Sequence, residues 1–290
     1  MAMRNSFESD TPIGLDHVGF IIPDLAASAE LFTALGFTLT PRADHTRTNA
    51  AGEVVSAGSS QHSIMLETGY VELMQITDPA AGHQLTPAIH SRFGLHVLAL
   101  EAPQAASWHT ECLRRGIAVG PLMDWSRPVK TPEREGLARV SFFDAPWQAD
   151  DPSYICWVQH LTPELVRSPA LLAHANGALA LMDVRYAGPD AALRDWSKRL
   201  QEAGAGAPVD PRGLGRLPLS QAGLTLEPDS QRSEVRPVAL TLRFADPEAL
   251  RARALDLGLA CLPLADGSAG FRLDLRETCG LFLDAVPADR

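Results

Sequence analysis

The chain has 290 residues, a formal net charge of −10 and a hydrophobic content of 46%. This apolar content suffices for one large domain or two medium ones. The acidic balance, without any Lys/Arg cluster, argues against nucleic acid or an anionic membrane as a partner. The sequence contains no uninterrupted apolar run of about 18 residues, so no membrane-spanning helix is predicted, and its polar start does not resemble a secretory signal.

The four cysteines are scattered along the chain and form no CxxC pair. They are Cys112, Cys156, Cys261 and Cys279. In a chain of this length such spacing is typical of reduced, buried thiols. We therefore expect a cytoplasmic protein without disulfides.

The first predicted unit opens on a short apolar strand that contains His17. Asp24 is a good N-cap for the helix that follows, Leu25 and Phe32 lie on one apolar face of it, and Gly36 ends it. Alternating or apolar runs then predict strands at residues 37–40, 54–55, 63–66 and 70–76.

A second unit repeats this course and places His96 early in its first strand, 79 residues after His17. Its helix lies between Pro103 and Gly116, and its later strands are predicted at residues 118–119, 138–143 and 154–159. A repeat that places a histidine at the same point of two copies suggests a site built between the copies.

Two further units follow, and neither contains a histidine. The third begins at residues 179–186 and shows one clear strand after its helix, at 224–226. The fourth begins at 238–244, has a helix that starts after Asp246, and then has strands at 259–264, 270–275 and 280–285. Strands outnumber helices about three to one, whereas a parallel βαβ sheet would need one strand per helix.

Several segments of the first half carry a family resemblance. They are Leu15–Leu25 (LDHVGFIIPDL), Ala34–Thr38, His62–Leu66, Gly69–Leu73, Gln159–Val166 and His174–Ala178. The chain resembles the vicinal oxygen chelate superfamily, closest to its glyoxalase-like branch, strongly over residues 13–178 and mainly in topology over 179–286. That superfamily includes glyoxalase I, extradiol dioxygenases and fosfomycin and bleomycin resistance proteins.

The resemblance implies an α+β fold in which four βαβββ units pair into two cupped half-barrel domains, with a divalent metal usually at the floor of a cup. We expect an N-terminal domain at 13–165 that carries the site, a connector at 166–178 and a degenerate C-terminal domain at 179–287. Because the second pair of units lacks histidine, any site with histidine ligands belongs to the first pair.

Strand alternation places His17 on the cup face, and the same parity places His96 there. Glu72 is a carboxylate in an apolar strand, and burying it without a partner would cost on the order of several kcal/mol. The resemblance puts His17, Glu72 and His96 on the usual ligand positions of the superfamily. Cys156 replaces the second expected acid, so His160 or Gln159 would have to substitute for it.

We therefore expect His17, Glu72, His96 and His160 to hold Zn, Mn, Fe or Ni, with a protein that works without metal as the alternative. Glu72 and His62 are the predicted catalytic residues, although His62 also suits a hydrogen-bonded structural role. His45 and His83 are expected in solvated loops. Two histidines and one carboxylate are the pattern of non-haem iron oxygenases, and the missing second acid argues against a true glyoxalase I.

Two functions remain open from the sequence. The first is a divalent-metal-dependent enzyme, of isomerase/lyase or dioxygenase type, that acts on a small organic molecule with chelating oxygens. The second is a metal-free protein that binds and sequesters a small molecule, as resistance proteins do. Aromatic residues of the second unit would suit such a ligand in both cases. Either protein would be a monomer or a homodimer.

Overall fold

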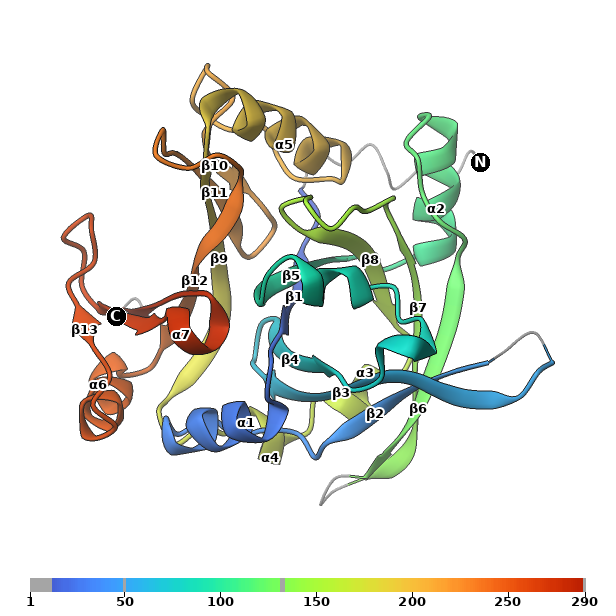
Figure 1. Cartoon of the computed structure of the whole chain (residues 1–290), viewed down its shortest axis with the longest axis horizontal. Coiled ribbons are helices and arrows are strands. Elements are labelled where there is room, and N and C mark those ends of the chain that lie inside the picture. Colours follow the sequence, from blue (N-terminus) through green and yellow to red (C-terminus); the bar gives the residue numbers. More distant parts are fainter. Residues whose placement is uncertain (1–11, 49–50, 131–133, 289–290) are drawn as a thin grey trace, which may run out of the picture.

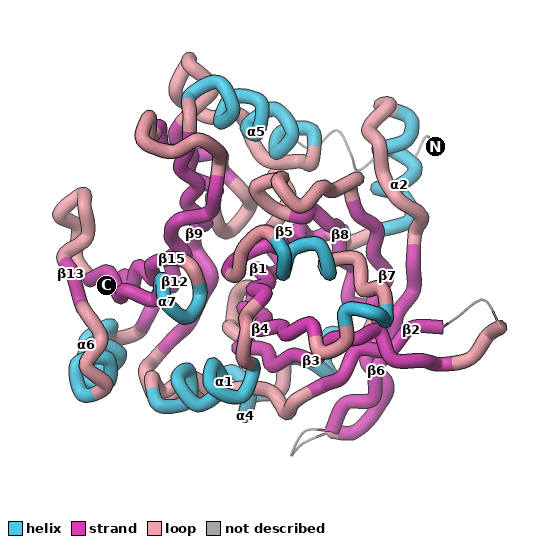
Figure 2. Tube along the Cα trace, viewed as in Figure 1, coloured by secondary structure: helices cyan, strands magenta, loops and turns pink. Residues whose placement is uncertain are grey.

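The structure is a computed structural model that describes residues 12–48, 51–130 and 134–288. It contains two mixed β-sheets (Figures 1 and 2). The first has eight strands in the order β2-β3-β4-β1-β5-β8-β7-β6, and the second has seven in the order β10-β11-β9-β12-β15-β14-β13. The α+β class is therefore confirmed.

The eight-stranded sheet uses the first half of the chain. Its strands are β1 (Leu15–Ile21), β2 (Ala43–Thr48), β3 (Val54–Met65), β4 (Tyr70–Ile76), β5 (Gly94–Glu101), β6 (Met123–Lys130), β7 (Glu135–Asp144) and β8 (Tyr154–His160). Its helices are α1 (Leu25–Ala34) and α2 (Ala105–Arg114), with short 3₁₀ turns at Pro79–Ala81 and Thr86–His90. Two short helices, α3 (Pro163–Val166) and α4 (Pro169–Leu172), follow.

The seven-stranded sheet uses the second half. Its strands are β9 (Ala178–Gly188), β10 (Gly215–Pro218), β11 (Gly223–Pro228), β12 (Arg236–Phe244), β13 (Cys261–Leu262), β14 (Phe271–Leu275) and β15 (Leu281–Pro287). Its helices are α5 (Asp190–Glu202), α6 (Pro247–Asp256) and α7 (Arg276–Cys279). The third unit thus has two strands after its helix, one fewer than the other units.

The caps expected from the sequence start two of the long helices. The Asp24 side chain accepts a hydrogen bond from the Ala27 backbone N–H at the start of α1, and Asp246 accepts one from Glu248 at the start of α6. Each cap satisfies a backbone donor that the first turn of a helix leaves unpaired. Within the described residues, none of the helices is long and apolar enough to cross a membrane.

Two predicted strands, at residues 37–40 and 118–119, are wrong. At the end of the first segment, the Thr40 N–H donates to the Ser63 carbonyl (2.8 Å). Just after the second segment, the Gly120 N–H donates to the Asp144 carbonyl (2.8 Å). One bond does not make a ladder, so the edge strands β2 and β6 begin a few residues later.

The eight-stranded sheet curls so that its two edge strands approach each other (Figure 1). The rings of His45 on β2 and Trp125 on β6 lie 6.4 Å apart between centroids. The outer face of this sheet shares one apolar core with the seven-stranded sheet, and Phe20, Tyr186 and Leu240 all belong to that core. The inner face is therefore the face that can enclose a ligand.

Candidate functional site

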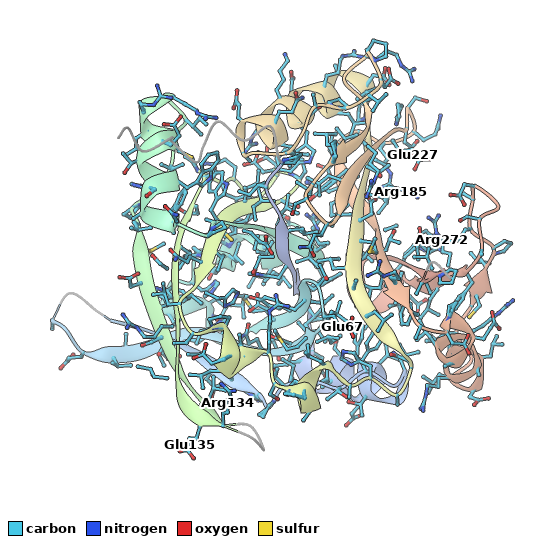
Figure 3. All side chains as sticks on the ribbon, turned by 180° about the vertical axis from the view of Figure 1, so that it is seen from behind. Glu67, Arg134, Glu135, Arg185, Glu227 and Arg272 are labelled. Carbon is cyan, nitrogen blue, oxygen red and sulfur yellow. The ribbon has the colours of Figure 1, made fainter. Side chains whose placement is uncertain are left out.

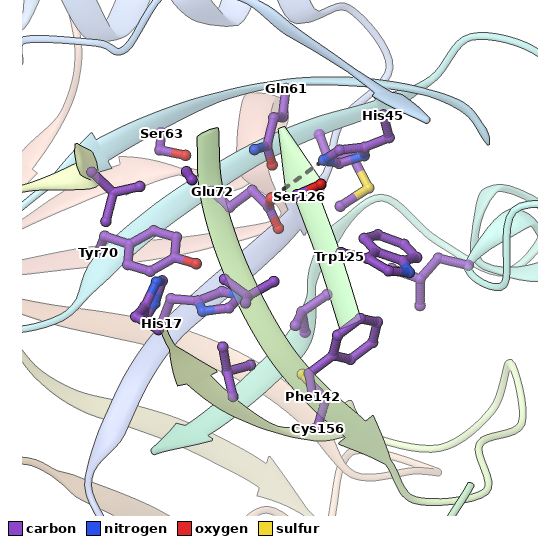
Figure 4. Close-up of a pocket in the computed structure, with 18 of the residues that line it drawn as sticks. His17, His45, Gln61, Ser63, Tyr70, Glu72, Trp125, Ser126, Phe142 and Cys156 are labelled. Carbon is purple, nitrogen blue, oxygen red and sulfur yellow. Dashed lines mark ion pairs between the residues drawn. The ribbon is translucent and has the colours of Figure 1, made fainter. Parts of the chain in front are cut away.

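The inner face of the curled sheet borders a half-open cavity of about 180 Å³, to which all eight strands contribute. Polar side chains line much of it (Figure 4). They include His17, Asp44, His45, Gln61, Ser63, Tyr70, Glu72, His83, Gln84, Tyr154, Cys156 and His160. Among the described side chains that line this cavity there is no Lys or Arg.

A β-bulge builds one side of the site. In the pairing of β1 with β5, Leu15 lies opposite Leu100 and His17 lies opposite Ala99, so Asp16 is the extra residue of β1. The bulge brings the Asp16 carboxylate against the ring of its own neighbour. His17 Nδ1 donates to Asp16 Oδ1 (2.7 Å).

Asp16 joins two histidines of the cavity. His160 on β8 donates from Nε2 to Asp16 Oδ1 (3.2 Å), beside the bond from His17. Burial alone would raise the pKa of Asp16, but the hydrogen bonds from His160 and His17 hold it well below its ordinary value. The ionised carboxylate fixes the tautomer of His17 and leaves Nε2 as the ring nitrogen available for proton transfer. The Tyr70 ring stacks on this imidazole, with centroids 4.2 Å apart.

Glu72 belongs to a second polar group of the cavity. The Glu72 side chain is 11% exposed, and its Oε1 lies 4.0 Å from His45 Nε2 (Figure 4). His45 Nδ1 shares a hydrogen bond with Ser59 Oγ (2.7 Å), and the ring of His83 stacks near that of His45 (6.2 Å between centroids). Burial lowers the pKa of His83 to about 4, so its ring is neutral.

The expectation that His45 and His83 are solvated is wrong, because both line the cavity. His45 lies on the edge strand β2, which begins later in the chain than the strand predicted at 37–40. Residues 43–48 (ADHTRT) contain a single apolar side chain, so no apolar/polar alternation marks this strand in the sequence. His83 lies outside the strands, and only the tertiary structure brings it to the site.

The predicted meeting of His17 with His96 does not occur. Gly19 lies opposite Val97 and Phe20 lies opposite Leu95, so His96 is the extra residue of a second bulge, on β5. Val97 is the residue of β5 that lines the cavity. The register agrees, because β4 pairs Tyr70 with His17 whereas β8 pairs Tyr154 with Val97.

His96 is instead a buried neutral residue. Its Nε2 donates to the Arg92 carbonyl (2.9 Å), and its ring meets the Trp147 ring edge-on. Burial, together with the charge of Arg92, lowers the pKa of His96 to about 3. These contacts describe a structural residue behind the cavity wall.

His62 also lies away from the cavity. Its neighbours Gln61 and Ser63 line the cavity, and since β3 alternates, His62 points to the other face. Its Nδ1 donates to the Thr40 carbonyl (2.7 Å). His62 therefore fits the hydrogen-bonded structural role, because its side chain does not line the cavity.

Cys156 occupies the position that corresponds to Glu72, as the sequence comparison predicts. Glu72 pairs with Gly19 in the first unit, and Cys156 pairs with Ala99 in the second. Burial raises the pKa of the Cys156 thiol well above its ordinary value. A neutral thiol is a poor metal ligand, because the thiolate is the form that binds.

The residues do not fit the divalent metal that the resemblance implies. Of the predicted ligands, His17, Glu72 and His160 line the cavity and His96 does not. His17 and His160 both bind Asp16, whereas Glu72 lies with His45. In the described parts of the chain, no group of three or more His, Cys, Asp or Glu side chains could hold a metal ion.

Comparison with known proteins supports the fold. The model of a family described as "Glyoxalase-like domain" matches residues 15–204, which is more than half of the chain. A comparison with curated proteins gives no match.

Three solved structures span nearly the whole chain at low identity. A hypothetical protein from Staphylococcus aureus has 10% identity and a TM-score of 0.66, covering 95% of this chain and 100% of that one. A mutant 4-hydroxymandelate synthase from Streptomyces coelicolor has 12% identity and a TM-score of 0.59 (96% and 93%). Homoprotocatechuate 2,3-dioxygenase from Arthrobacter globiformis has 12% identity and a TM-score of 0.51 (97% and 81%). These similarities show the expected fold, and the chemistry has to be inferred from the residues of the site.

Proposed function

This chain belongs to the glyoxalase-like domain family, and we propose that it binds a small organic molecule in the N-terminal cavity and catalyses a proton transfer on it. His17 would be the acid–base group. The observation that carries the proposal is the hydrogen bond from His17 Nδ1 to the buried, ionised Asp16. A carboxylate that orients an imidazole and stabilises its charged form is the usual companion of a catalytic histidine.

The proposed step takes a proton from a carbon next to a carbonyl group. His17 Nε2 accepts the proton, the electron pair of the C–H bond passes into the carbonyl as an enolate, and the proton returns to carbon or oxygen. Glu72 and His45 lie together in the same cavity and would be the second acid–base group. Two such groups at different parts of one cavity suit an isomerase-type reaction better than dioxygen chemistry.

The proposal assigns no step to a metal ion, because the donors of the described residues do not form a metal site. The four cysteines are free, which agrees with the cytoplasmic setting that we propose. A monomer or a homodimer remains the prediction for the oligomeric state.

A sequestering protein is the second candidate function. The aromatic side chains of Trp125 and Phe142 on the cavity wall favour it, because such a wall holds an apolar ligand without any reaction. Both candidates require binding, so only turnover separates them.

Deuterium exchange tests the proposal directly. The purified protein is incubated in D₂O with one-ring ketones, aldehydes and esters that carry an acidic C–H, and proton NMR follows the C–H signal. Exchange that depends on the protein and is lost in His17→Gln supports the enzyme. Binding of the same compounds without exchange supports sequestration.

A further inference from the structure

His83 reaches the cavity from the connection between β4 and β5. It lies between the two 3₁₀ turns, is 8% exposed and lines the cavity together with Leu85. Its backbone carbonyl accepts from the Thr86 N–H (2.9 Å), and its ring accepts at Nδ1 from the Leu85 N–H (3.1 Å). Two backbone hydrogen bonds therefore hold the residue and its ring in place.

The hydrogen bond from Leu85 fixes the tautomer of His83. A backbone N–H can only donate, so Nδ1 presents its lone pair, and a neutral imidazole then carries its single proton on Nε2. Burial keeps the ring neutral, because it lowers the pKa of His83 to about 4. At neutral pH, His83 is thus an uncharged ring that donates from Nε2.

The Nε2–H group of His83 is open to a ligand. Within the described residues it has no hydrogen-bond partner, and Nε2 is not one of the fully buried polar atoms that lack one. His17 and His160 differ, because each directs a ring N–H at Asp16. His83 therefore offers the cavity an imidazole donor that no acceptor of the described chain occupies.

The proposed proton transfer needs a donor of this kind. When a base removes a proton next to a carbonyl group, negative charge develops on the carbonyl oxygen, and a donor that is already in position stabilises it. Among the described side chains that line the cavity there is no Lys or Arg to do so. A neutral imidazole can polarise a carbonyl through its N–H without giving up the proton.

His83 lies at the Glu72 end of the cavity. Its ring stacks near that of His45 (6.2 Å between centroids), and His45 Nε2 lies 4.0 Å from Glu72 Oε1. Figure 4 shows His45 away from His17. The Glu72 carboxylate would repel an enolate oxygen at this end, so the oxygen has to meet a donor directly.

From these observations we infer that His83 is a further catalytic residue, whose Nε2–H binds the carbonyl oxygen of the substrate and stabilises the enolate oxygen. His17 Nε2 takes the proton from the adjacent carbon, the electron pair of the C–H bond forms the enolate, and the proton returns. His83 keeps its own proton throughout. The inference deepens the proposed function and rests on it.

Infrared spectroscopy of a bound ketone tests the inference without turnover. The probes are cyclohexanone and acetophenone with an isotope label at the carbonyl carbon. Their single ring suits a cavity of about 180 Å³, since a cavity of about 150 Å³ takes up one benzene molecule. A hydrogen bond lowers the C=O stretching frequency, so the bound ketone should absorb at lower frequency in the parent protein than in His83→Leu. His83→Gln keeps an N–H donor near the position of Nε2 and should retain part of this shift.

The same variants separate catalysis from binding. We expect His83→Leu to lower the C–H exchange rate by about 10²- to 10³-fold, the usual loss when one donor to an oxyanion is removed. Ketone binding should weaken by no more than about tenfold, and His83→Gln should retain at least about tenfold more exchange than His83→Leu. His109→Leu is the matched control, because His109 also makes one backbone hydrogen bond, to the Gly120 carbonyl (2.9 Å), but does not line the cavity.

If His83→Leu does not fold, nuclear magnetic resonance of the parent protein decides instead. The His83 ring should carry its proton on Nε2 at neutral pH, and this N–H signal should shift when a ketone is added. A ring that carries its proton on Nδ1, or an N–H signal that bound ketone does not move, overturns the inference.

The inference and the proposed function fail separately. If the carbonyl frequency depends on His83 but the parent protein catalyses no exchange, the proton transfer is wrong and the binding of the carbonyl by His83 is supported. If exchange depends on His17 while His83→Leu leaves the exchange rate unchanged, the proton transfer stands and the catalytic role of His83 is overturned. Failure of both ketones to bind at millimolar concentration also overturns it.

Discussion

The two sheets of this protein are built from similar units, yet they treat their polar side chains differently. The N-terminal sheet borders a half-open cavity that is lined by His17, His45 and Glu72. In the C-terminal sheet, charged residues pair with each other across neighbouring strands. Arg272 on β14 donates two hydrogen bonds to Asp284 on β15 (2.6 and 2.7 Å).

This pairing continues over further strands of the C-terminal sheet. Arg185 lies 3.5 Å from Glu227 and 3.9 Å from Asp284, and Thr225 donates to Asp183 (3.0 Å). Figure 3 shows Arg185, Glu227 and Arg272 on this part of the molecule. Charges that pair with each other are not available to a substrate, which supports our proposal that the first sheet carries the chemistry and that the second sheet supports it.

Replacing His17 should give the largest effect. His17→Gln removes the proposed base, so we expect the C–H exchange rate to fall by about 10²- to 10⁴-fold, the usual contribution of a general base. His62→Gln is the matched control on the outer face and should retain full exchange. Equal loss in both variants would remove the distinction between cavity and outer face.

Asp16→Asn should lower the same rate by less than His17→Gln does, because the imidazole remains and loses only its ionised partner. The variant should also shift the pH profile of exchange, which a merely structural role would not do. Exchange measured across pH in both proteins checks this. An unchanged profile would mean that Asp16 does not act through His17.

In the C-terminal sheet, Arg272→Met should destabilise the fold without affecting ligand binding. Asp284 is 2% exposed, and removing its hydrogen-bonded partner leaves a buried carboxylate with the more distant Arg185 (3.9 Å), which costs up to about 3–5 kcal/mol. Urea denaturation measures the loss. The double variant Arg272→Met/Asp284→Leu should recover most of it, and altered ligand affinity in either variant would contradict a purely supporting role.

Acid should weaken the N-terminal half through its buried histidines. Burial lowers the pKa of His96 from 6.5 to about 3 and that of His83 to about 4. The unfolded chain therefore binds these protons first, and stability is full above pH 6.5 and falls as the pH drops toward these values. The expected slope is about 1.4 kcal/mol per pH unit for each histidine.

Chemical denaturation at several pH values between 6.5 and 4 measures this slope. His96→Gln should reduce it by about half, since His83 continues to contribute. Equal slopes in the variant and the parent protein would show that His96 is not the buried neutral group that the structure describes.

Added Zn²⁺, Mn²⁺, Fe²⁺ or Ni²⁺ should have the smallest effect. Because the donors do not converge, we expect no stoichiometric metal by elemental analysis after native purification and no increase in melting temperature on titration. Metal that copurifies and is lost in His17→Ala would instead restore the metal-dependent hypothesis.

The sequence alone determined the order of the repeated units and the strand that contains His17. Helix positions follow from local signals such as the Asp24 and Asp246 caps, and strand parity placed His17 toward the cup. The correspondence of Cys156 with Glu72 was also readable, because both lie in regular strands without a bulge before them. These features depend on residues a few positions apart in the sequence, so they can be recognised from one sequence.

The tertiary structure decided which side chains meet. One extra residue in each of β1 and β5 brings Asp16 onto His17 and turns His96 away, and a one-residue shift reverses the face of a side chain. His45 and His83 reach Glu72 only because the sheet curls and brings an edge strand and a loop to the same cavity. The β-bulges and the curvature of the sheet depend on pairing with strands that are distant in the sequence. They cannot be predicted from the spacing of residues along one strand.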